Sequence, residues 1–292
     1  MTEFNERLLQ LHHCKGIGWK SIFRLLQVDP TLLSIYELSP NKAQTLLQIS
    51  NTNAKLFIND LHSMKNQSML NHYNDKNIHV ITIFDREYPE LLKQIYDPPW
   101  VLYLEGNINI LNETRFLGVV GTRNPTHYGY LSMEKVLVPL IKKGWVIISG
   151  LAMGIDTKAH QLSLEHNGST IAVIAGGLHH IYPKCNQKLA SEITGSNLII
   201  SEYPPDSFPE KWQFPMRNRI ISGLSSGTII IEAQERSGSL ITANLALQQG
   251  REVFAIPGPI HVKTSIGTNQ LIQAGAKLVL NSEDITAEFA YL

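Results

Sequence analysis

One short segment, Lys211–Arg219, gathers the side chains best suited to bind a polyanion. Its sequence, KWQFPMRNR, contains three cations and two aromatic rings, and no acidic residue follows until Glu232. Cations neutralise phosphates, and aromatic faces stack on nucleobases. Because the whole chain is neutral, with 25 basic and 25 acidic side chains, the segment indicates a localised site rather than binding through overall charge.

The same segment contains the start of a helix. Pro215 suits the first helical position, and Met216–Leu224 is predicted as a short helix. A helix N-terminus offers free N–H groups to an anion. Trp212 and Phe214 alternate, so they share one face of an extended segment, and we expect at least one of these rings to belong to the core.

The two arginines of the segment are expected to play different roles. Arg217 and Arg219 lie two residues apart, so on a helix they point to different faces. We expect one of them to face a ligand and the other to pair with Glu202 or Glu232. The segment therefore predicts both contact with a ligand and support of the site.

From Phe116 onward the sequence alternates strand, turn and helix, which predicts an α/β fold with a doubly wound, mostly parallel sheet. The predicted helices are Tyr128–Lys143, Thr157–Asn167 and Leu240–Gln249. The predicted strands, several of them apolar enough to be buried on both faces, are Phe116–Val120, Trp145–Ser149, Thr170–Ala175, Leu198–Ser201, Thr228–Ile231, Glu252–Ile256 and Lys277–Leu280.

We predict three parts: a small all-helical N-terminal domain (residues 1–65), a connector packed on the main domain (66–114) and a Rossmann-like main domain (115–292). In the first part, Gly16-Ile17-Gly18 separates two apolar helices. This pattern is similar to a helix-hairpin-helix, a module that grips nucleic-acid backbone in many proteins, and the domain as a whole is sterile-alpha-motif-like or helix-hairpin-helix-like. An ordinary interhelical turn explains the same glycines, and both interpretations stay open.

The turns that follow the strands should converge on one crevice, because ligands of open α/β sheets bind at the carboxyl ends of the strands. Ser149–Asp156 is the best phosphate-cradle candidate, since Gly150 and Gly154 let backbone N–H groups approach a ligand. The alternative is a tight turn that only packs helix on sheet. Arg123, after the first strand, and Lys184, near the third, are expected at the crevice mouth, where an arginine can fork onto a phosphate.

Other polar residues near these turns favour structural roles. We expect Asp156 to cap a helix, although Asp156 and His160 are spaced to pair on one helix face. No activated nucleophile lies nearby, so we expect no catalytic residue. The hydroxyls of Ser237 and Ser239 could bind an anion, but helix capping is the favoured interpretation.

Composition excludes several classes of protein. Cys14 and Cys185 lie far apart and form no CxxC pair, which argues against a zinc ribbon or a disulfide framework. The histidines lack metal-ligand spacing, so we expect no metal and no cofactor. No apolar run reaches membrane-spanning length, and the N-terminus lacks the pattern of a signal peptide. We therefore expect a cytoplasmic protein without membrane attachment.

Taken together in this order, the motifs resemble the DNA-processing protein A family, also called Smf. The resemblance covers residues 80 to 282, with Thr122 standing where the family usually has serine. Some members carry a further winged-helix-like domain, and we expect none after Leu292. The motifs that carry the resemblance are Gly121–Arg123, Ser149–Asp156, Gly176–Gly177, Tyr182–Pro183, Ser201–Pro204, Phe214–Ile221, Ser237–Leu240, Gly250–Gly258 and Gly267–Asn269.

The resemblance implies an extended Rossmann-like domain that binds single-stranded DNA in natural transformation, protects the incoming strand and loads the RecA recombinase, usually as a homodimer. By motif position, the DNA-contacting residues of the family fall on Arg123, Lys184, Lys211 and Phe214. With the residues singled out above, the predicted DNA-binding set is Arg123, Ser149, Gly150, Gly154, Lys184, Lys211, Phe214, Arg217, Asn218 and Arg219.

Two alternatives to a non-catalytic DNA binder stay open. One is an enzyme acting on a nucleotide in the same crevice, for example by cleaving its glycosidic bond, with Glu232 as the nearest acid after a strand. The other is an adaptor that binds a protein partner and no nucleic acid.

Overall fold

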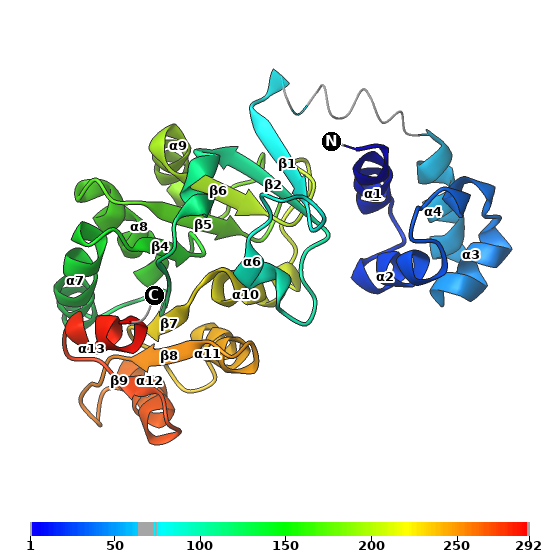
Figure 1. Cartoon of the computed structure of the whole chain (residues 1–292). Coiled ribbons are helices and arrows are strands. Elements are labelled where there is room, and N and C mark those ends of the chain that lie inside the picture. Colours follow the sequence, from blue (N-terminus) through cyan, green and yellow to red (C-terminus); the bar gives the residue numbers. More distant parts are fainter. Residues whose placement is uncertain (1, 64–72, 74, 291–292) are drawn as a thin grey trace. The chain divides into compact units, whose positions relative to one another are not determined.

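The computed structural model describes residues 2–63, 73 and 75–290. The chain divides into two compact units: Met1–Tyr88 with Pro99–Tyr103, and Pro89–Pro98 with Leu104–Leu292. The predicted boundary after residue 65 lies outside the described residues, and the boundary predicted at residues 114/115 stays a prediction. Figure 1 labels most of the helices and strands of the two units.

The first unit is mainly helical, as predicted. Its apolar helix faces are buried, including Leu8, Leu11 and Ile22. Gly16 has a φ of 82°, and a Cβ at this position would collide with the backbone of Asn53. The turn glycine therefore has a packing role, and backbone binding by this motif stays a prediction. The elements are α1 (Glu3–His13), α2 (Trp19–Val28), η1 (Ser34–Glu37), α3 (Pro40–Leu47), α4 (Asn51–Ser63), β1 (Ile78–Thr82) and the first half of β2 (Val101–Gly106).

The second unit is built around a sheet with the strand order β6-β5-β4-β3-β7-β8-β9. Each pair of neighbours in this series is parallel. The Rossmann-like, doubly wound fold predicted from the sequence is confirmed. The strands are β3 (Phe116–Val120), β4 (Val146–Ser149), β5 (Thr170–Ile174), β6 (Leu198–Ser201), β7 (Gly227–Ile230), β8 (Glu252–Ala255) and β9 (Lys277–Leu278).

Helices cover both faces of this sheet. On one face, Leu117 and Val119 of β3 are buried in one cluster with Ile155 and Ala159 of α8 and with residues of α7. Helix α10 also contacts β3, β4 and β5, but its buried residues lie outside this cluster, so it covers the other face. The helices are α6 (Glu90–Lys93), α7 (His127–Lys142), α8 (Ile155–Glu165), α9 (Gln187–Ser196), α10 (Gln213–Leu224), α11 (Gly238–Gln248), α12 (Lys263–Gln273) and α13 (Glu283–Thr286), with short 3₁₀ turns η2 (Ile108–Asn112), η3 (Lys184–Asn186) and η4 (Ala287–Phe289).

The strand order reverses between β3 and β7. The chain runs outward from β3 through β4 and β5 to β6, then returns to place β7 on the other side of β3. Loops that follow the two strands at such a switch point diverge and leave a crevice at the carboxyl edge of the sheet. The fold therefore places its crevice between the loop after β3 and the loop after β7.

The predicted start of the helix in the cationic segment differs from the structure. Helix α10 begins at Gln213, so Pro215 is its third residue rather than its first. A proline is accommodated there because the N–H groups of the first turn have no partner within the helix.

Among the described residues, no helix is long and apolar enough to cross a bilayer.

Candidate functional site

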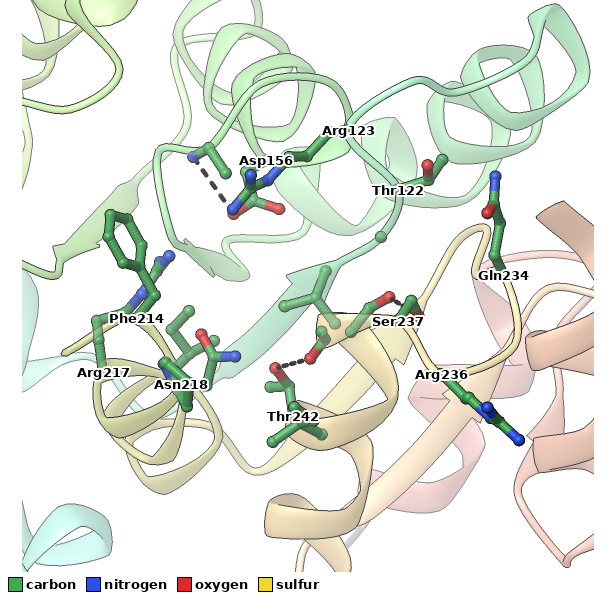
Figure 2. Close-up of a pocket in the computed structure, with 18 of the residues that line it drawn as sticks. Thr122, Arg123, Asp156, Phe214, Arg217, Asn218, Gln234, Arg236, Ser237 and Thr242 are labelled. Carbon is green, nitrogen blue, oxygen red and sulfur yellow. Dashed lines mark hydrogen bonds between the residues drawn. The ribbon is translucent and has the colours of Figure 1, made fainter. Parts of the chain in front are cut away.

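A cleft of about 700 Å³ lies at the switch point between β3 and β7, within the second unit. Figure 2 shows the elements around it: the loop after β3, the start of α10, the loop after β7 and the start of α11. We call the first two the first wall and the last two the second wall. The residues that line it are Val120–Asn124, Ala152, Asp156, Tyr182, Lys211, Phe214, Pro215, Arg217, Asn218, Ile221, Gln234–Ser239, Ile241 and Thr242.

The first wall combines cations with an aromatic pair. Arg123 and Lys211 are exposed at its rim, and the Phe214 ring meets the Tyr182 ring edge-on, with centroids 5.5 Å apart and planes at 71°. Phe214 is half-buried, and Trp212 is exposed. The expectation that one of Trp212 and Phe214 belongs to the core was wrong, because α10 starts early enough to turn Phe214 into the cleft.

The second wall is rich in hydroxyl and amide groups. Ser237 occupies the N-cap position of α11, but its side chain makes no capping hydrogen bond, and its Oγ lies 2.9 Å from Oγ of Ser239. The capping role favoured from the sequence is therefore not the one these hydroxyls adopt. Gln234, Arg236 and Thr242 complete this wall. Sequence reasoning missed these three, although their position was the available signal: Gln234 and Arg236 lie in the loop after β7, and Thr242 lies near the start of α11, which follows that loop.

The predicted phosphate cradle already holds a carboxylate of the chain. The backbone N–H groups of Gly150 and Ala152 donate to Oδ2 of Asp156, at 3.1 and 3.4 Å. Helix α8 starts at Ile155 with Gly154 at its N-cap, so the prediction that Asp156 caps the helix was wrong. Burial raises the pKa of Asp156, while the Arg217 charge and these hydrogen bonds oppose the rise. The loop is consequently a turn closed by its own carboxylate, with Ala152 and Asp156 in the lining of the cleft.

The side chain of Arg217 packs against the Ser149–Asp156 turn at Gly150. It is 5% exposed, its Nη1 donates to the carbonyl of Val173 at 3.0 Å, and a Cβ on Gly150 would overlap its guanidinium. Burial lowers the pKa of Arg217 to about 10, with the Asp156 charge opposing that shift. Its Nε has no hydrogen-bond partner, and the residue reaches the cleft lining. Arg217 therefore joins the Ser149–Asp156 turn to strand β5. It also places a buried positive charge at the lining of the cleft.

Arg219 points the other way, as the spacing predicted. Its Nη2 donates to Oε1 of Glu202 at 2.5 Å, and its Nε lies 3.3 Å from Oδ2 of Asp97. The expectation that one arginine pairs with Glu202 is confirmed. Burial raises the pKa of Glu202, and the charge of Arg219 opposes that rise. Arg219 is 4% exposed and is not part of the cleft lining.

Of the remaining predicted residues, some line the cleft and others are buried in structural contacts or lie outside the lining. Asn218 lines the cleft. Ser149 is fully buried and donates to the carbonyl of Val119 at 2.6 Å. Gly154, with a φ of 80°, lets its loop approach the backbone of Thr122 and Arg123. Lys184 is exposed, but it lies on η3, beyond the residues that line the cleft.

Two groups named for catalysis are engaged in structural bonds. The carboxylate of Glu232 accepts hydrogen bonds from the N–H and Oγ1 of Thr126 and from Oγ1 of Thr264, all at 2.8 Å. Nδ1 of His160 lies 2.7 Å from Oγ1 of Thr170, and burial lowers the pKa of His160 to about 3. Neither group faces the cleft. Within the described residues, no three His, Cys, Asp or Glu side chains gather as a metal site.

Comparison with known proteins decides the family. A family model described as DNA recombination-mediator protein A matches residues 79–290. The chain belongs to this family. Among curated DprA proteins, that of Bacillus subtilis is 50% identical over 216 residues, which are 74% of this chain and 73% of the relative. The DprA of Streptococcus pneumoniae is 48% identical over 210 residues, 72% of this chain and 74% of the relative.

Solved DprA structures share the fold. The crystal structure of Streptococcus pneumoniae DprA superposes with a TM-score of 0.85 at 38% identity and covers 99% of both chains. A Helicobacter pylori DprA structure, described by its single-stranded DNA binding mode, superposes with a TM-score of 0.66 at 32% identity and covers 73% of this chain and 96% of that one. The resemblance seen in the sequence motifs is confirmed.

Proposed function

We propose that this DprA-family protein binds single-stranded DNA in the cleft between β3 and β7. The observation that carries the proposal is that Arg123, Lys211 and the Phe214 ring all line this one cleft. The two cations are placed to neutralise phosphates and the ring to stack on a base. The Helicobacter pylori relative, described as a single-stranded DNA binder, supports the assignment.

The geometry favours an unpaired strand. Phe214 offers its ring inside a cleft, where only a base that is free of its partner can stack, because paired bases hide their faces in the duplex. Three exposed cations line the cleft, Arg123, Lys211 and Arg236, which corresponds to few neutralised phosphates per protomer. Binding should therefore weaken with salt, with a shallow slope for a protein of this size.

The wider role follows from membership of the family. We infer that the protein acts in natural transformation in the cytoplasm, protects incoming single strands and loads a RecA-type recombinase, and that it works as a homodimer. The family description, recombination mediator, supports this role. Recombinase-driven strand exchange on DNA coated with a single-strand-binding protein would measure the loading activity.

Charge reversal at the rim tests the proposed site. Arg123→Glu and Lys211→Glu should each abolish binding of a fluorescent oligothymidylate at physiological salt, measured by anisotropy at two salt concentrations. Lys135→Glu, at an exposed position of α7 outside the cleft lining, is the matched control and should bind like the parent. Undiminished affinity in both rim variants, with circular dichroism unchanged, contradicts the assignment.

A further inference from the structure

A second aromatic pair lies next to the cleft but outside its lining. The rings of His180 and Phe208 stack with centroids 3.8 Å apart and planes at 28°. In the cleft, Tyr182 and Phe214 form the corresponding pair. Each pair takes one ring from the turn after β5 and a second ring from α10 or the segment before it: Phe208 precedes α10, and Phe214 lies in its first turn. The two pairs therefore repeat the same arrangement along two adjoining segments.

Backbone hydrogen bonds hold these two segments side by side. The N–H of Gly177 donates to the carbonyl of Ser207 at 2.8 Å, and the N–H of His179 donates to the carbonyl of Pro205 at 3.0 Å. A Cβ on Gly177 would collide with the carbonyl of Pro205, so the close approach requires glycine. The second pair is thus fixed in place by the same loops that position the first.

The order of residues along the segment suits a strand that continues past the cleft. Phe208, Lys211 and Phe214 follow one another at intervals of three residues, so an exposed cation stands between two aromatic rings. Phe208 is 72% exposed and offers much of its ring to solvent. Six residues span at most about 20 Å, and a stacked single strand with a charge about every 3.4 Å covers that distance in about six nucleotides.

The acidic residues of this segment are engaged with neighbours. Oδ1 of Asp206 lies 2.8 Å from Nδ1 of His179, and the indole N–H of Trp212 donates to Glu210 at 2.7 Å. Both carboxylates therefore lie against partners other than Lys211, the cation at the centre of the segment.

We propose that His180 and Phe208 form a second nucleobase-stacking site, which extends the DNA path out of the cleft and across Lys211. This inference rests on the proposed function, because it requires a strand that already occupies the cleft. The ligand class is single-stranded DNA of any sequence, since every base has a face that can stack.

Length dependence tests this second site. Affinities would be measured for oligothymidylates of about 4 and about 12 nucleotides, within the range of single-strand site sizes, so that only the longer one bridges both pairs. Phe208→Ala should weaken binding of the longer oligonucleotide by about fivefold or more and leave the shorter one unchanged. Phe214→Ala should weaken both. Tyr96→Ala is the control, because Tyr96 is exposed and its neighbour Ile95 packs at Gly223, the opposite end of α10 from Phe214.

The outcomes separate the two proposals. If Phe208→Ala leaves the longer oligonucleotide unaffected while Phe214→Ala weakens it, the second site is wrong and the cleft assignment stands. Equal loss at both lengths also overturns a separate second site. If neither Phe214→Ala nor Arg123→Glu changes binding, the cleft assignment itself fails. Photocrosslinking of 5-iododeoxyuridine in the longer strand, mapped by mass spectrometry, should identify Phe208 directly.

Discussion

The first wall of the cleft and the layer behind it both contain cationic side chains, but those of the wall are exposed and those of the layer are buried against carboxylates. At the wall, Arg123 and Lys211 are exposed and make no ion pair among the contacts of the described residues. Behind it, Arg217 and Arg219 are buried and lie against Asp156 and Glu202. Three of these four cations come from one segment of nine residues. Counting the cations of the Lys211–Arg219 segment in the sequence therefore overestimates how many of them can contact a ligand.

The difference arises from the helix that begins within the segment. Lys211 precedes α10, and its exposed side chain lies at the rim of the sheet-end loops. Phe214 and Arg217 are three residues apart on α10 and share a face, so the ring lies in the cleft above the buried arginine. Arg219 is rotated onto another face, toward Glu202. The wall should consequently determine affinity, whereas the layer behind it should determine stability.

The largest effect that tests this contrast is expected at Arg219. Arg219→Ala leaves the buried Glu202 carboxylate without its partner and should cost about 3–5 kcal/mol of the free energy of unfolding, measured by urea denaturation. Replacing both partners with apolar residues, Arg219→Met with Glu202→Leu, should recover much of the loss. If Arg219→Ala has normal stability but no longer binds the oligonucleotide, Arg219 contacts the ligand and the structural role proposed for it is wrong.

Phe214 tests the wall with an intermediate effect. Phe214→Ala should weaken oligonucleotide binding by about 1–3 kcal/mol through lost stacking, with the salt slope unchanged because no charge is removed. Lys211→Gln should lower the slope by about one unit. Anisotropy titrations over a range of salt measure both quantities. A slope that falls equally in the two variants would contradict this division of roles.

The smallest effect concerns pH and the layer behind the wall. Burial, with a lesser contribution from the Arg217 charge, lowers the pKa of His160 to about 3, below the unfolded value of about 6.5. As pH falls through 6.5 the unfolded chain takes up a proton that the folded chain does not, so stability decreases toward acid. Between about pH 6.5 and about pH 5.5 this amounts to about 1 kcal/mol.

His160→Gln isolates this contribution, because the other titrating groups remain in both proteins. The difference in unfolding free energy between parent and variant should change with pH over this interval. A difference independent of pH would indicate that His160 does not titrate as its burial implies.

Much of the fold was predictable because buried parallel strands are continuous apolar runs. All seven strands predicted for the main domain are present, and β3 and β6 have the predicted bounds. The convergence of Arg123, Lys211 and Phe214 followed from the rule that ligands bind at the carboxyl ends of strands. These inferences depend on periodicity and strand ends, which a single sequence records.

The second wall and the closed Ser149–Asp156 turn were not predictable in the same way. A glycine-rich loop after a strand fits a phosphate or an internal carboxylate equally well, and only the three-dimensional structure shows that Asp156 folds back onto Gly150. The wall from Gln234 to Thr242 depends on β7 lying beside β3, which is a property of strand order. Local sequence patterns do not specify which distant strands become neighbours.

The Glu232 carboxylate has a consequence for how the cleft is assembled. It accepts hydrogen bonds from Thr126 across 106 positions of the chain and from Thr264 across 32, so the loops after β3 and β7 are joined here by contacts of high sequence separation. Such contacts form late in folding, because loop closure must precede them. The cleft should therefore be absent from partly folded chains, and DNA-binding competence should be among the last properties that a newly made molecule acquires.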